Sequence, residues 1–157
     1  VVFCSGVGRG EQMEELTTSN LPAFLANFTQ DINQVDDAFK QLSHSKLALF
    51  DQTGHPLGRR KIKDRRQTLV DLRLTLKDFE KRPRDLVVTM TLSDQTEELA
   101  DEVYDLSQVA YDNDREELGL DLTDALNRFN KDADLLEAYA LELATENERQ
   151  LNQLEKK

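Results

Sequence analysis

The chain of 157 residues has few of the residues on which several common protein classes depend. Cys4 is its one cysteine, so neither an internal disulfide nor a cysteine-based metal cluster can form. It has no tryptophan, three prolines and six glycines, which are too few turn-forming residues for a sandwich of many short strands. No apolar run approaches the roughly 20 residues that cross a bilayer. We therefore expect a soluble protein without a membrane span.

Histidine is also scarce, since His44 and His55 are the only two in the chain. Ferritin-like metal centres in helical bundles use a Glu-x-x-His pair on each of two helices. Glutamine, not glutamate, stands three residues before each histidine. The sequence therefore predicts no metal and no other cofactor.

The segment around Cys4 resembles the phosphate-binding loop of protein tyrosine phosphatases, in which an arginine follows a nucleophilic cysteine and clamps the phosphate. That loop has five residues between the two, whereas four separate Cys4 from Arg9. With no nucleophile–base pair elsewhere, we predict that the protein is not an enzyme. We expect residues 1–20 to be a flexible or loosely structured segment. Val1 to Gly6 has the composition of the end of a signal peptide, which leaves export and localisation open.

Acidic residues outnumber basic ones by 31 to 20, for a net charge of −11, which disfavours nucleic acid as a partner. The charges are unevenly distributed: residues 59–84 carry a net charge of +7, and residues 85–117 carry −10. The basic segment indicates either contact with an anionic surface or partner through residues 59–66, or ion pairing with the acidic segment that follows it. Its candidate partner-binding residues are Arg59, Arg60, Lys61, Lys63 and Arg66.

Apolar residues recur at alternating steps of three and four along most of the chain, which places them on one face of a helix. Helices are expected over residues 21–50, 59–82, 85–112 and 120–157. Long helices with short connections are typical of an all-α, antiparallel up-down four-helix bundle, here formed by residues 21–157. We expect the core of this bundle to contain Phe39, Leu72, Val103 and Phe129.

Two segments fit a strand as well as a helix. Residues 86–92 alternate and are rich in β-branched side chains. Residues 46–50 precede a run of turn-forming residues, as the first arm of a hairpin does. The alternative fold is therefore α+β with a small hairpin.

The fourth expected helix is longer than the other three by about ten residues at the usual rise. The apolar face becomes polar there, at Asn147, Gln150 and Leu154. Polar residues in such a seam lower affinity but select register and partner. We therefore expect this end either to dock weakly on a helical protein or a second copy, as a weak homo-oligomer, or to be a solvated helix end.

The sequence thus favours a non-enzymatic helical bundle that acts through protein–protein binding, as a scaffold, adaptor or assembly module. The alternative is a ligand-sensing domain, since the expected architecture and length are similar in outline to the four-helix extracytoplasmic sensor domains of bacterial chemoreceptors.

Overall fold

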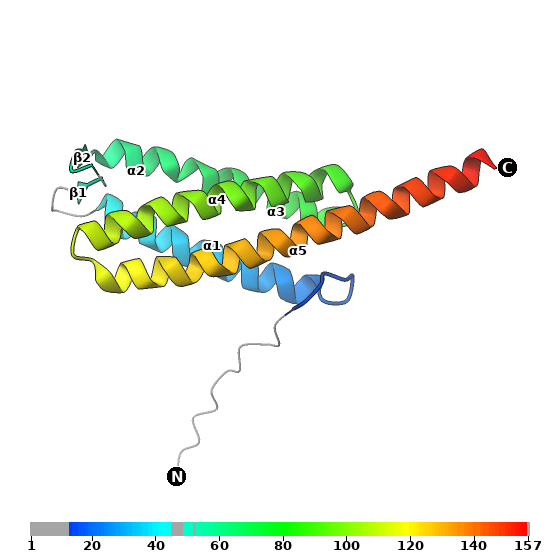
Figure 1. Ribbon diagram of the computed structural model, residues 1–157, viewed down its shortest axis with the longest axis horizontal. Helices are drawn as coiled ribbons and strands as arrows, with labels where there is room; N and C mark the ends of the chain where they lie inside the picture. The colour runs from blue at the N-terminus through cyan, green and yellow to red at the C-terminus, as the bar shows by residue number, and fades with distance from the viewer. Residues whose placement is uncertain (1–12, 45–48, 52, 157) are drawn as a thin grey trace, which may run out of the picture.

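The computed structural model describes residues 13–44, 49–51 and 53–156. Helices hold most of these residues, and their apolar faces pack together in one elongated bundle (Figure 1). The prediction of an all-α helical bundle is confirmed. The elements, in chain order, are α1 (Leu21–Ser43), β1 (Leu49–Phe50), β2 (Pro56–Leu57), α2 (Arg59–Arg65), α3 (Gln67–Lys81), α4 (Leu86–Asp112) and α5 (Glu116–Glu155).

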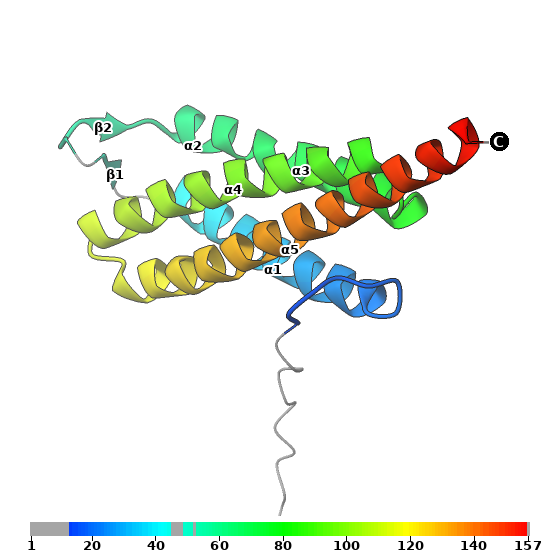
Figure 2. The ribbon, with the colours of Figure 1, turned by 45° about the vertical axis from the view of Figure 1, so that its right-hand side comes forward.

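The helices follow one another back and forth along the long axis (Figure 1). α1 leads away from the end where α3 finishes, α2 and α3 return to it, α4 leads away again and α5 comes back (Figure 2). α4 and α5 make the most extensive contact, α3 packs on α4, and α1 packs on α5. α1 and α3 touch over a much smaller area, so the bundle is least closed between them.

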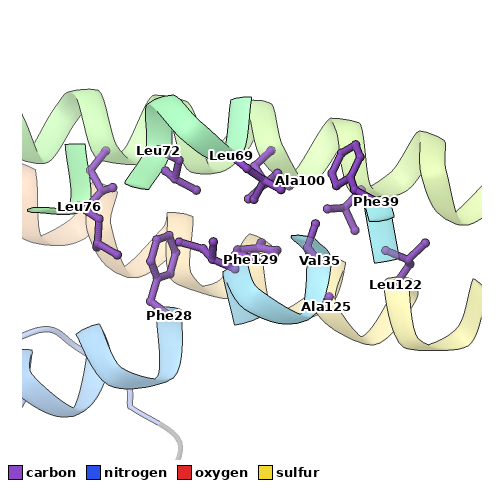
Figure 3. Close-up of a cluster of buried hydrophobic side chains, with 14 of the residues drawn as sticks. Phe28, Val35, Phe39, Leu69, Leu72, Leu76, Ala100, Leu122, Ala125 and Phe129 are labelled. Carbon is purple, nitrogen blue, oxygen red and sulfur yellow. The ribbon is translucent and has the colours of Figure 1, made fainter. Parts of the chain in front are cut away.

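Each long helix carries a stripe of apolar residues at steps of three and four. These stripes meet in the middle of the bundle and form the core (Figure 3). The ring of Phe28 in α1 lies edge-on to the ring of Phe129 in α5, with centroids 5.7 Å apart. The four residues that the sequence predicts to be buried are at most 1% exposed: Phe39, Leu72, Val103 and Phe129. That prediction is confirmed.

A hairpin follows the first helix, which ends at Ser43 and does not reach Phe50. β1 pairs antiparallel with β2, so that Leu49 lies opposite Leu57. The Asp51 carboxylate accepts hydrogen bonds from the backbone N–H groups of Thr53 and His55, both at 2.9 Å, and this closes the turn. The prediction of helix over residues 49–50 is therefore wrong, and the first arm of the alternative hairpin is correct. Residues 45–48 lie outside the described residues.

A residue far along the chain, Asn113, stabilises the hairpin through hydrogen bonds. The Asn113 side chain, between α4 and α5, accepts a hydrogen bond from the Phe50 N–H and donates one to the Phe50 carbonyl, each at 3.1 Å. It thereby pairs with the free edge of β1 as a neighbouring strand would. A contact across more than sixty residues stabilises the extended backbone here, and no local pattern encodes it.

The second ambiguous segment, residues 86–92, is helical and opens α4. The Asp85 carboxylate accepts a hydrogen bond from the Val88 N–H at 3.1 Å, which caps the first turn. The cap and the burial of Val88 and Leu92 outweigh the β-branched composition.

The second expected helix is divided into α2 and α3 at Arg66. Its side chain is bound to α1 at this point, as described below. The fourth helix begins at Glu116, earlier than residue 120. Gly119 makes this possible, because a Cβ at that position would lie 2.7 Å from the ring of Tyr111 in α4.

Candidate partner-binding surfaces

Part of the basic segment is bound within the bundle and does not face a partner. Arg66 donates to Asp36 of α1 from both Nε, at 2.6 Å, and a terminal nitrogen, at 3.2 Å. Arg73 and Lys40 lie 3.5 and 3.2 Å from the same carboxylate. Burial alone would raise the pKa of Asp36, but the hydrogen bonds from Arg66 and Lys40 outweigh it and lower that pKa. Arg66 therefore fastens the junction of α2 and α3 to α1.

Arg65 makes the ion pairs with the acidic helix. Its guanidinium lies 3.5 Å from Glu102 and 3.3 Å from Asp105, both in α4. Burial raises the pKa of Glu102, and the charge of Arg65 opposes that rise. The sequence indicates that the basic segment forms ion pairs with the acidic segment, and such pairs are present. Arg65 forms them, and it is not one of the candidate partner-binding residues.

Arg60, Lys61 and Lys63 are exposed on α2, and none of them has an ion pair with a described residue. Of Arg59 the structure describes the backbone, which begins α2. Three of the five basic candidates therefore remain accessible on the surface of a helix of seven residues.

The end of α5 extends beyond the rest of the bundle, where it is drawn in red in Figure 1. Leu143 is the last buried residue of this helix. All side chains from residue 147 to 155 are exposed, and we name this stretch the C-terminal overhang. It includes the candidates Asn147, Gln150 and Leu154. At 1.5 Å per residue it is about 13 Å long.

The overhang continues the stripe by which α5 packs in the bundle. From Leu136, Ala140 and Leu143, which are buried, steps of three and four lead to Asn147, Leu151 and Leu154. Leu151 is 62% exposed and Leu154 67%. The sequence candidates omit Leu151, although its distances from Asn147 and Leu154 place it on the same face.

A groove lies between α1 and α3, where the two helices make little contact. It has a volume of about 790 Å³ and is partly open to solvent. Buried side chains form its floor: Leu21 and Ile32 of α1, and Leu76 of α3. Its charged lining residues are all on α3, namely Arg73, Lys77 and Glu80, whereas Thr18, Ala26 and Thr29 line the other side.

Nothing in the sequence indicates this groove. Its apolar residues have the same spacing as core residues, and only the packing leaves them partly uncovered. Leu25, for example, belongs to the regular stripe of α1 but is only partly buried, and it lines the groove.

Charged side chains of α1 and α5 interact where the two helices meet. Arg128 of α5 donates from Nε to Asp31 of α1 at 2.6 Å and from a terminal nitrogen to Gln34 at 2.7 Å. Burial, and then the negative charge of Asp31, raise the pKa of Asp132 to about 7, against the opposing charges of Arg128 and Lys131. Asp132 is therefore a partly buried acid with a pKa near neutral.

Neither histidine has a position suited to metal binding. His44 is exposed and its Nδ1 lies 2.7 Å from the Lys40 carbonyl, while His55 is exposed in the hairpin turn. Within residues 13–44, 49–51 and 53–156, no three His, Asp or Glu side chains are grouped so that they could hold a metal ion. In the same residues, no helix is long and apolar enough to cross a membrane. Cys4 and Arg9 lie outside the described residues.

The surfaces that distinguish the molecule are thus the exposed end of α5, the open groove beside α1 and the three accessible cations of α2. The end of α5 exposes two leucines among polar residues, the groove has an apolar floor, and both depend on helices that are not fully covered by their neighbours. Comparison of the chain with protein-family models, with curated protein sequences and with solved structures found no match.

Proposed function

We propose that the protein is a non-enzymatic assembly module that binds another helix through the C-terminal overhang of α5. The observation that carries the proposal is the exposure of Leu151 and Leu154 on the same stripe that packs α5 into its own bundle. Burial of a leucine contributes ~1.5–3 kcal/mol. Covering both side chains with a helix would therefore contribute ~3–6 kcal/mol, from which the entropic cost of association is subtracted, so the contact is a weak one.

The polar residues of the overhang favour a selective contact over a tight one. Asn147 and Gln150 replace apolar residues next to the leucines. An amide that enters a helix seam must find a hydrogen-bonding partner, so it discriminates against helices that offer none. The partner is therefore a helical protein or a second copy of this chain, and the module serves as a scaffold or adaptor.

The test compares two faces of the same helix end. Leu151→Gln with Leu154→Gln changes the leucine face, and Arg149→Gln with Lys156→Gln is the matched control on the opposite face. Chemical cross-linking in the native cell should show association that the leucine variant loses and the control keeps, and sedimentation of the pure protein should show the same if the partner is a second copy. If the leucine variant keeps every association of the unchanged chain, the overhang is a solvated helix end and the proposal is wrong.

One observation favours a second candidate, a ligand-sensing domain. The α1–α3 groove has a volume of about 790 Å³, which is within the range of small-molecule sites, and its floor is apolar. A small-molecule library screened by thermal shift tests this function. Binding that Leu76→Gln abolishes, with the overhang deleted, would favour it over the assembly module.

A further inference from the structure

The overhang and the α1–α3 groove are complementary surfaces at the same end of the molecule. The groove is formed by the beginning of α1 and the end of α3, and the overhang leaves the bundle beside them (Figures 1 and 2). Arg84, which follows the groove residue Pro83, donates to Glu146 just before the overhang at 2.5 Å. This ion pair lies between the end of the groove and the start of the overhang.

The two surfaces are similar in their apolar character. The overhang presents a convex apolar ridge, Leu151 and Leu154, whereas the groove is an open concave strip with an apolar floor. Its floor residues Leu21, Ile32 and Leu76 come from two helices that a third helix can bridge. An amphipathic helix lying in a groove between two helices is a common mode of recognition.

The polar residues at the edges also match. Glu148 and Glu155 stand three residues before and four after Leu151, so they flank the ridge on one side. The α3 edge of the groove carries Lys77, which is exposed and has no ion pair within the described part of the chain, and Arg73, which also lies 3.5 Å from the Asp36 carboxylate.

On the other side of the ridge stands neutral Gln150, and the α1 edge of the groove is neutral too, with Thr18 and Thr29. Among the described residues, Glu80 is the one acid that lines the groove. The acidic side of the ridge therefore suits the α3 edge, and its neutral side suits the α1 edge.

From these observations we propose that the groove of one copy receives the overhang of a second copy of this chain. Because both surfaces lie at the same end, two copies that face each other end to end can place each overhang in the other's groove. Such a contact is reciprocal and closes on a dimer rather than extending into a filament. The inference rests on the proposed function, since it names the partner of the same overhang.

The experiment uses variants that block one surface each. Ala26→Glu places an acid on the α1 side of the groove, where it fills space and would be left without a partner under the apolar ridge. Its matched control is Ala23→Glu, at another exposed alanine of α1 that does not line the groove. Deletion of residues 147–157 removes the overhang. Circular dichroism and melting temperature confirm that each variant keeps its fold.

Sedimentation equilibrium of the full chain should give a mass that rises to a dimer with concentration. Ala26→Glu and the deletion should each lower the association constant by at least about tenfold, because each removes both apolar contacts. Ala23→Glu should leave it unchanged. An equimolar mixture of Ala26→Glu with the deletion variant should regain association, because the overhang of one fits the open groove of the other.

The possible failures are distinguishable. If Ala26→Glu dimerises as well as the unchanged chain while the deletion does not, the overhang docks elsewhere, so this inference is wrong and the proposed function stands. If the full chain is a monomer throughout, the inference is wrong and the overhang has a different helical partner. If the deletion and the full chain dimerise equally, both proposals fail.

Discussion

Neutralising Asp132 should stabilise the protein at neutral pH, which is unusual for removal of a charge. In the fold its pKa is about 7, against 3.8 for an unperturbed aspartate. The carboxylate is therefore easier to ionise in the unfolded chain, where it is solvated and distant from Asp31. Asp132→Asn retains the shape of the side chain and removes the ionisation.

The sign and size of the effect follow from this difference in pKa. A pKa raised by folding contributes stability that is complete below pH 4 and is lost as the pH rises through about 7. A difference of about three pKa units at 1.36 kcal/mol each corresponds to at most ~4 kcal/mol. Since 1 kcal/mol changes the melting temperature of a domain of this size by ~2–4 °C, the variant should melt up to ~8–16 °C higher at pH 8.

The assay is urea unfolding of the variant and the unchanged chain at pH 4.5 and pH 8. The difference between the two proteins isolates Asp132, because other acids such as Asp36, whose pKa the fold lowers, act in both. Asp134→Asn, at an exposed position two residues away, is the matched control and should change little at either pH. The reasoning is refuted if Asp132→Asn is no more stable than the unchanged chain at pH 8, or if its advantage is the same at pH 4.5.

Three further changes test the packing. Phe129→Ala should cost ~3–5 kcal/mol in urea unfolding, since the ring is fully buried; a loss below ~1 kcal/mol would mean that α5 is packed by another face. Arg65→Gln should lower the melting temperature at low salt, since it removes ~1 kcal/mol of stability, and the loss should shrink at high salt. Arg60→Gln should leave the melting temperature unchanged. Equal effects of the two variants would contradict the ion-pair assignment. Gly119→Ala should destabilise the protein although alanine favours helix by ~1 kcal/mol, because its Cβ would lie 2.7 Å from the Tyr111 ring; a higher melting temperature would show that the ring moves aside freely.

The regular spacing of apolar residues was sufficient to predict which side chains form the core. Phe39, Leu72, Val103 and Phe129 each lie at a step of three or four from their neighbours, and each is buried. This works because a helix converts spacing along the chain directly into direction around its axis. The same rule extends α5 past the bundle and places Leu154, and Leu151 beside it, on the exposed continuation of the seam.

The spacing of apolar residues could not predict the features that depend on contacts between residues far apart in the sequence. Residues 49–50 are extended because they pair with β2 and because Asn113 satisfies the backbone of Phe50. A basic run likewise looks uniform in sequence, yet Arg65 and Arg66 are bound to α4 and α1 while Lys63 is exposed. A basic side chain forms an ion pair only if it lies on the side of the helix that packs against a neighbouring helix.

Only the tertiary structure determines that a groove lies between α1 and α3. Leu25 and Leu76 have the spacing of ordinary core residues, and local sequence determines only that they share a helix face with their neighbours. Whether that face is covered depends on how far two helices separate, and this follows from the packing of every other helix in the bundle. In this protein α1 packs on α5 and α3 on α4, so the face between α1 and α3 is left open to solvent.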